Sequence, residues 1–308
     1  MAQPIRFIEV APRDGFQNWP DPVSTEVKER LVRDLLGAGV TTVEATSFVS
    51  PRWVPQMADA EELMRRLGAG LAPRLRVLVP NLRGYRRAIE AGAREVVVNV
   101  GATDGFNRRN LNRSIDETLA EITGVCAAAR VDRVATVGSL SVAWGCPYDG
   151  PVSAGRALEV AERLEAAGCE RLSIADTIGV AHPTGVRELM AMALGRFGPD
   201  RVAAHFHDTR GLGVANALAA LEVGVREFEG SVGGIGGCPF APRATGNVCS
   251  EDLLHLLELT GQPSGASIPA LIEIADGLAQ TLGKPLPGKL YKAGLEPWVA
   301  VGGAAPAQ

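Results

Sequence analysis

Polar residues that can do chemistry stand at the ends of short apolar runs in this chain. An aspartate, two histidines and an asparagine can form a metal shell, and an arginine and a cysteine are left for other chemistry. If the runs are parallel strands of one barrel, all of these side chains point into a single mouth. The set comprises Arg13, Asp14, Glu44, Asp176, His205, His207, Cys238 and Asn247.

The sequence His205-Phe206-His207 is a pair of metal-ligand residues at strand spacing. Residues i and i+2 of a strand face the same side, so both imidazoles can point into the barrel mouth and reach one ion. The alternative is one buried histidine bonded to backbone and one histidine facing solvent. The chain has only 4 histidines, and finding two of them together at a strand end favours the metal interpretation.

Asp14 follows the first strand, and Asn247 lies in the segment after the last one. Two imidazoles, a carboxylate and an amide oxygen form a nitrogen and oxygen site without a thiolate. Such a set suits an octahedral Mg²⁺ or Mn²⁺ better than a structural zinc ion. The alternative for Asp14 is an ordinary turn residue.

Arg13 and Glu44 are charged residues in places where apolar ones are expected. A guanidinium at a strand end can donate hydrogen bonds to a carbonyl oxygen that becomes an enolate. An acid within an apolar strand is rarely buried without a partner, so we expect Glu44 to pair with Arg13. The alternative for Arg13 is a purely structural salt bridge to Glu44 or Asp176, and both interpretations can hold together.

Cys238 lies in the glycine-rich sequence GGIGGCP. Glycines permit close backbone approach, which suits a segment that closes on a ligand, and a thiol there can act as an acid or a base. The alternative is a small apolar filler, which is the usual role of a free cysteine. Cys126, Cys169 and Cys249 fit that second role, whereas Cys146, at the end of the fifth strand, fits either role. The segment is not a phosphate-binding P-loop, because no Lys-Ser/Thr pair follows the glycines.

Eight strand–helix units in succession predict how these residues are positioned. Alternating strands and helices indicate a parallel sheet, and eight units indicate closure as a (β/α)8 TIM barrel. We expect a single catalytic domain over residues 1–308, with the barrel at about 5–262 and an additional C-terminal helix and tail at about 263–308. The expected strands are Ile5–Val10, Thr41–Thr46, Arg74–Val79, Glu95–Val100, Arg133–Val142, Arg171–Ala175, Arg201–His207 and Glu227–Ser231. The expected helices are Ser24–Leu36, Gln56–Leu67, Leu82–Ala91, Ser114–Ala129, Val152–Ala167, Pro183–Gly195, Gly213–Val223, Ser250–Leu259 and Ile268–Leu282.

The composition excludes several classes of protein. The net charge is −4 and the 31 basic residues are dispersed, which argues against nucleic acid as a partner. No apolar run reaches the ~18 residues that a membrane span needs, and we see no secretory signal. The 5 cysteines are odd in number and form no CxxC, which indicates a reduced, cytoplasmic protein.

Six motifs together resemble the 3-hydroxy-3-methylglutaryl-CoA lyase family, which belongs to the metal-dependent TIM-barrel lyases. They are, in order, EVAPRDGFQN, VEATSFVSPRWVPQMAD, GCPYDG, ADTIGV, HFHDTRG and GGIGGCPFAPRATGN, and the match as a whole runs from about Ile5 to about Leu259. The resemblance implies cleavage of (S)-3-hydroxy-3-methylglutaryl-CoA to acetyl-CoA and acetoacetate, a step of leucine degradation and ketone-body formation. It also implies a Mg²⁺ or Mn²⁺ cofactor, an acyl-CoA substrate and a homodimer or higher homo-oligomer.

The resemblance also implies a role for each matching residue. The implied metal ligands are Asp14, His205, His207 and Asn247, and the implied catalytic residues are Arg13, Glu44, Asp176, His205 and Cys238. Arg13 and Gln17 are implied to bind substrate, and Glu251 matches an acidic residue of the same region. In the implied mechanism, His205 or Asp176 takes the proton of the 3-hydroxyl, Arg13 stabilises the thioester enolate and Cys238 protonates it.

Some positions depart from the pattern of the family, namely Trp19-Pro20, Ala143, Arg210 and Phe240. They leave the catalytic set intact and bear on the acyl group, so citramalyl-CoA or another 3-hydroxyacyl-CoA is an alternative substrate. A condensing synthase is disfavoured because such synthases usually carry a further C-terminal regulatory domain, and few residues follow Leu259. A non-catalytic CoA-binding barrel is disfavoured because no catalytic position is lost. A dehydrogenase is disfavoured because no GxGxxG follows the first strand.

Overall fold

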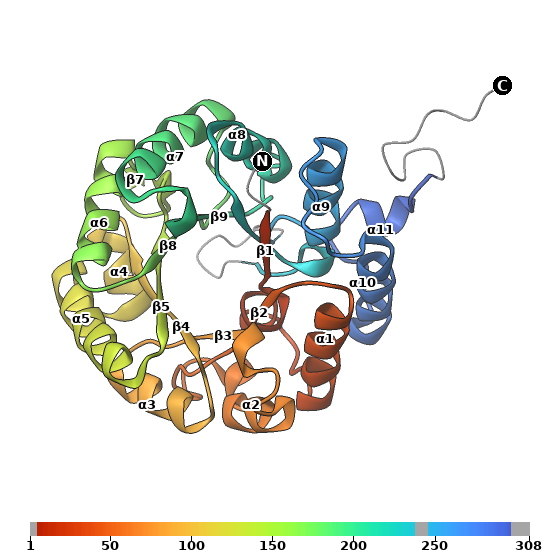
Figure 1. Ribbon diagram of the computed structural model, residues 1–308, viewed down its shortest axis with the longest axis horizontal. Helices are drawn as coiled ribbons and strands as arrows, with labels where there is room; N and C mark the ends of the chain where they lie inside the picture. Colours follow the sequence, from red (N-terminus) through yellow and green to blue (C-terminus); the bar gives the residue numbers. More distant parts are fainter. Residues whose placement is uncertain (1–4, 238–245, 297–308) are drawn as a thin grey trace.

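Eight parallel strands close into a barrel in the order β1-β10-β9-β8-β5-β4-β3-β2 (Figure 1). The structure is a computed structural model that describes residues 5–237 and 246–296. The predicted (β/α)8 barrel is therefore confirmed. Its strands are β1 (Arg6–Glu9), β2 (Thr42–Ser47), β3 (Leu75–Leu78), β4 (Glu95–Gly101), β5 (Ala135–Ser141), β8 (Arg171–Asp176), β9 (Val202–Phe206) and β10 (Glu227–Gly230).

The helices surround the barrel as an outer layer (Figure 1). Ser24 and Ser114 accept hydrogen bonds from the first turns of their helices, as expected of N-cap residues, and Ser114 forms a complete capping box with Glu117. The predicted additional C-terminal helix is present as α10. The helices are α1 (Thr25–Gly37), α2 (Ala60–Leu67), α3 (Leu82–Glu90), α4 (Asp104–Leu111), α5 (Ile115–Asp132), α6 (Ala154–Ala166), α7 (Pro183–Phe197), α8 (Gly213–Val223), α9 (Ser250–Leu259), α10 (Ile268–Leu282) and α11 (Leu290–Ala293).

Several short elements were missed by the sequence analysis. They include α4, α11, a small hairpin and a π-helical turn directly after β1. The 3-10 turns η2 to η4 precede α2, β3 and β9, and η5 follows β10. The hairpin is β6 (Gly145–Cys146) with β7 (Gly150–Pro151), and the short turns are η1 (Ala11–Gly15), η2 (Pro55–Met57), η3 (Ala72–Arg74), η4 (Pro199–Arg201) and η5 (Val232–Gly234).

Charged side chains occupy part of the barrel interior, where branched aliphatic residues are usual. At the amino ends of the strands, Arg171 contacts Glu95 at 2.6 Å and Glu227 at 3.1 Å, and Arg6 contacts Glu227 at 2.8 Å. Toward the opposite end, Arg76 is 1% exposed. The apolar core lies between the strands and the helices instead.

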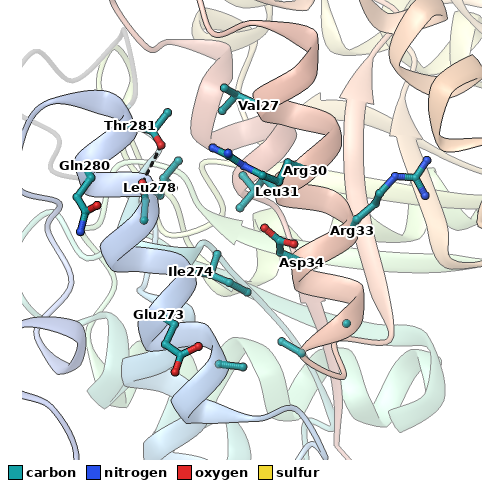
Figure 2. A pocket seen from close by; sticks show the side chains of 14 residues that line it. Val27, Arg30, Leu31, Arg33, Asp34, Glu273, Ile274, Leu278, Gln280 and Thr281 are labelled. Carbon is teal, nitrogen blue, oxygen red and sulfur yellow. Dashed lines mark hydrogen bonds between the residues drawn. The ribbon is translucent and has the colours of Figure 1, made fainter.

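A groove of about 630 Å³ lies on the outside of the barrel between α1 and α10 (Figure 2). Val27, Leu31 and Asp34 line it from α1, and Ile274 and Leu278 line it from α10. None of the predicted site residues lines this groove. Each helix in the described part of the chain is too short or too polar to span a membrane.

Candidate active site

Three predicted metal ligands meet at the carboxyl ends of the barrel strands. Asp14 lies on the π-helical turn η1 after β1, His205 lies on β9, and His207 follows β9. The Asp14 Oδ2 atom is 4.0 Å from Nε2 of His205 and 3.9 Å from Nε2 of His207. One possible ligand atom from each residue lies within 4.8 Å of the other two, so a single ion can contact all three.

Asn247 lies beside this triad and pairs with His207 through a backbone bridge. Its Nδ2 donates to Asp14 Oδ2 at 2.7 Å and to the carbonyl oxygen of Ile235 at 3.1 Å. Its Oδ1 is buried and has no hydrogen-bond partner among the described residues. A buried amide oxygen without a partner, next to a carboxylate, fits the oxygen-preferring cation that the sequence predicts.

The protonation states of Asp14 and His207 favour metal binding. Burial opposes the charge of Asp14, but Arg13 and the two histidines hold its pKa at about 2, so the carboxylate is ionised. Burial and the charge of His205 lower the pKa of His207 to about 3, so that ring is neutral and can offer a lone pair. A metal ligand must be deprotonated in this way.

Glu229 on β10 orients His205 from behind. Its Oε2 lies 2.8 Å from Nδ1 of His205, and the two residues are register partners on neighbouring strands. Burial opposes a charged His205, but the hydrogen bond and charge of Glu229 raise its pKa above the ordinary value. The contact directs Nε2 toward Asp14, as carboxylates do behind metal-binding histidines.

Arg13 is held by two carboxylates. Its Nε donates to Glu44 Oε1, and its Nη1 donates to Asp14 Oδ1 at 2.6 Å. The expected pair between Glu44 and Arg13 is therefore present, and Glu44 is fully buried. Within the described residues, Nη2 of Arg13 makes no further hydrogen bond, which leaves it available to a ligand oxygen.

Asp176 ends β8, next to the strand that carries His205. Its two oxygens accept hydrogen bonds from the backbone amides of Val180 at 2.9 Å and Ala181 at 3.0 Å. Burial nevertheless raises its pKa above the ordinary value. A buried carboxyl group with a raised pKa is better suited to accept a proton than an exposed one.

The remaining predicted residues differ in what the structure shows. The Oε1 atom of Gln17 is buried without a hydrogen-bond partner among the described residues. Glu251 lies in the first turn of α9, where it accepts a hydrogen bond from the Gly233 amide at 3.1 Å, and burial raises its pKa to about 7. Cys238 lies outside the described residues. The other cysteines are buried, as fillers should be.

Glu9 fixes the backbone that carries Arg13 and Asp14. Its Oε1 accepts hydrogen bonds from the amides of Ala11 at 2.8 Å and Val232 at 3.0 Å, and its Oε2 lies 2.6 Å from Oγ of Ser250. One buried carboxyl group thus joins η1, η5 and the start of α9. Single π-helical turns are frequent at functional sites, and this one aims the arginine–aspartate pair.

Close backbone contacts fix the position of Asn247. The amide of Asp208 donates to the carbonyl of Gly246 at 2.9 Å. A Cβ atom on Gly246 would lie 2.0 Å from the carbonyl oxygen of Gly234, and one on Gly236 would lie 2.2 Å from Nδ2 of Asn247. Glycine is therefore required at positions 236 and 246, where these close contacts occur, and both glycines have positive φ.

Glu229, Glu9 and Arg76 are not among the site residues predicted from the sequence. All three are charged residues in predicted strands, which is the same signal that identified Glu44. Trp19, one of the positions that depart from the pattern of the family, has the Lys284 ammonium over its ring at 4.3 Å, so its ring contacts the segment after α10.

A (β/α)8 barrel with this ligand set at the carboxyl ends of its strands has the architecture of a barrel enzyme that uses a divalent cation.

The sequence model of the HMGL-like family matches residues 4–277, and the chain belongs to that family. Relatives include an (R)-citramalyl-CoA lyase from Chloroflexus aurantiacus, 44% identical over 94% of this chain and 95% of that protein. Another relative is the mitochondrial hydroxymethylglutaryl-CoA lyase of Rattus norvegicus, which is 40% identical over 94% of this chain and 89% of that protein. A solved HMG-CoA lyase from Acinetobacter baumannii, in complex with coenzyme A and 3-methylmalate, superposes with a TM-score of 0.90 at 36% identity and covers 96% of this chain and 97% of that one.

Proposed function

We propose that this protein is a divalent-cation-dependent lyase that cleaves (S)-3-hydroxy-3-methylglutaryl-CoA to acetyl-CoA and acetoacetate. The convergence of Asp14, His205 and His207 next to Arg13 carries the proposal. Relatives named hydroxymethylglutaryl-CoA lyase, at about 40% identity over most of the chain, support the substrate.

The donor set fits Mg²⁺ or Mn²⁺, held by Asp14, His205, His207 and Asn247. When bound there, such a cation supplies Lewis-acid activation of a hydroxyl group. The ionised Asp14, the neutral His207 and the unpartnered Oδ1 of Asn247 are the features of this chain that support it.

The arrangement favours Asp176 over His205 as the base. Nδ1 of His205 contacts Glu229, and its Nε2 would be occupied by a cation held with Asp14 and His207. The carboxyl group of Asp176 has a raised pKa and can take the proton of the 3-hydroxyl. As that proton leaves, C3 becomes the ketone of acetoacetate and the bond between C2 and C3 breaks.

Arg13 stabilises the other fragment. The electron pair of the broken bond passes to C2, and the thioester oxygen develops the charge of an enolate. Nη2 of Arg13 can donate to that oxygen while Glu44 and Asp14 hold the guanidinium in place. Cys238, in the segment outside the described residues, is our candidate acid for the proton that completes acetyl-CoA.

Citramalyl-CoA is a second candidate substrate, because the C. aurantiacus relative with that name is 44% identical over 94% of this chain. It differs from the first substrate by one methylene group between C3 and the free carboxylate. The same residues would perform the same steps, and the second product would be pyruvate in place of acetoacetate.

Product analysis with both substrates tests the proposal. The protein is reconstituted with Mn²⁺ or Mg²⁺ and compared with a sample containing EDTA. Acetoacetate and acetyl-CoA from the first substrate, lost with EDTA and recovered with metal, are the expected result. Pyruvate from citramalyl-CoA alone would assign the second substrate, and cleavage of neither would refute both.

A further inference from the structure

Arg76 is a buried cation near the carboxyl end of the barrel interior. It lies on β3 and is 1% exposed. Its Nη2 atom is 2.6 Å from Glu44 Oε2 and 2.9 Å from Glu229 Oε1. Arg76 therefore joins two carboxylates, one on β2 and one on β10.

Each of these carboxylates uses its other oxygen to hold a site residue. Glu44 Oε1 accepts from Nε of Arg13, and Glu229 Oε2 contacts Nδ1 of His205 at 2.8 Å. Arg13 in turn contacts Asp14, which faces His205. The charges thus form a closed ring in the order Asp14, Arg13, Glu44, Arg76, Glu229 and His205.

Stability alone gives a poor account of Arg76. Removing a guanidinium from water is costly, and buried ion pairs commonly contribute little net stability compared with apolar residues of similar size. The Nε and Nη1 atoms of Arg76 have no hydrogen-bond partner among the described residues, which adds to this cost. What Arg76 does provide is a fixed separation and orientation of Glu44 and Glu229.

We propose that Arg76 is a positioning residue of the lyase site, which sets Arg13 through Glu44 and His205 through Glu229. The inference rests on the proposed roles of Arg13 and His205. Without Arg76, Oε2 of Glu44 and Oε1 of Glu229 lose the cation that lies between them, and the two buried carboxylates repel each other and move apart. Such movement would disturb the guanidinium and the imidazole that these carboxylates hold.

Arg171 offers a matched control at the other end of the same barrel. It also bridges two glutamates, Glu95 and Glu227, and its side chain is 16% exposed. It lies at the amino ends of the strands, away from the site. Arg76→Met and Arg171→Met therefore remove the same kind of bridge, and only the first touches the residues of the ring.

The test measures Mn²⁺ affinity by calorimetry without substrate, kcat and KM with substrate, and unfolding by urea. We expect Arg76→Met to weaken Mn²⁺ binding by about 10-fold and to lower kcat; this is the low end of the loss for an outer-shell partner, because Arg76 acts on His205 through Glu229. Arg171→Met should be less stable in urea but should keep the Mn²⁺ affinity and the kcat of the wild type. Unchanged Mn²⁺ affinity and kcat in a folded Arg76→Met protein would overturn the proposal.

A second pair of variants covers the case in which Arg76→Met does not fold. Arg76→Lys keeps the buried charge but lacks the planar guanidinium, so it should shift Mn²⁺ affinity and kcat in the same direction, whereas Arg171→Lys should match the wild type. Wild-type values in both lysine variants would overturn the proposal. Failure of the proposed function is distinguishable, because the wild type would then cleave neither substrate while the Mn²⁺ measurements would still report on Arg76.

Discussion

Glu9 gives the protein a pH-dependent stability that one substitution should remove. Its side chain is fully buried, and burial raises the pKa of Glu9 to about 8. Its Oε1 accepts two backbone amides, and its Oε2 meets the Ser250 hydroxyl. A glutamine can reproduce this geometry, since its Oε1 can accept both amides and its Nε2 can donate to Ser250. Glu9→Gln should therefore keep the contacts and remove the titration.

The size of the effect follows from the raised pKa. The protonated Glu9 side chain stabilises the fold fully at pH values below 4.5, the pKa of the unfolded state. This stabilisation is lost as the pH rises through about 8, the pKa in the folded protein. Each pH unit within that window costs about 1.4 kcal/mol for one proton, so the free energy of unfolding falls by about 4 kcal/mol between about pH 5 and about pH 8. Glu9→Gln should lack this fall.

Urea unfolding at a series of pH values measures the difference. Burial raises the pKa of Glu251 to about 7, and Glu251 is present in both proteins, so the wild type minus Glu9→Gln reports Glu9 together with its repulsion by Glu251. Glu258→Gln removes an exposed carboxyl group from the same helix α9 and should leave the pH dependence of the wild type. If the Glu9→Gln and wild-type curves run parallel, Glu9 is ionised in the folded protein and the reasoning is wrong.

Four further substitutions test the site and the contacts that support it. Arg13→Ala should lower kcat by about 10²- to 10³-fold and weaken Mn²⁺ binding less than His207→Ala, which removes a ligand; equal losses of Mn²⁺ affinity would contradict these separate roles. Lys28→Met should lower the free energy of unfolding by about 3 kcal/mol, because Lys28 is 2% exposed and its ammonium joins α1 to Asp59, the residue before α2; an unchanged urea midpoint would refute this. Gly246→Ala should weaken Mn²⁺ binding at least about tenfold, since its Cβ would lie 2.0 Å from the Gly234 oxygen; wild-type calorimetry would show that this close contact can relax.

The barrel could be predicted from sequence because its signals are local. Apolar runs alternate with capped helical patterns, and eight such units leave few alternatives to closure. The helix α4 was missed because its sequence, DGFNRRNL, is polar and its apolar period is weak. The π-helical turn was missed because APRDG, with proline and glycine, has the composition of a turn.

The candidate site was predictable in part. His205 and His207 are two residues apart on a strand, so their common direction follows from the sequence. The position of Glu44 in an apolar strand predicted that it has a charged partner, and the structure confirms that this partner is Arg13. The contact of Arg76 with Glu229 was not predictable, because β3 and β10 are distant in the chain and only closure of the barrel brings them together.

The ring of charges through Arg76 also bears on how the chain folds as it is synthesised. Glu44 and Arg76 emerge early, on β2 and β3, whereas Glu229 emerges last among the barrel strands, on β10. Until β10 is synthesised, one side of Arg76 lacks its counter-charge, and β1 lacks one of its two neighbouring strands. Such long-range pairing is slow to form, so we expect nascent chains that end before β10 to remain unfolded and to need protection from aggregation. The same charges that orient the site would then delay burial of the barrel interior until the last strand is in place.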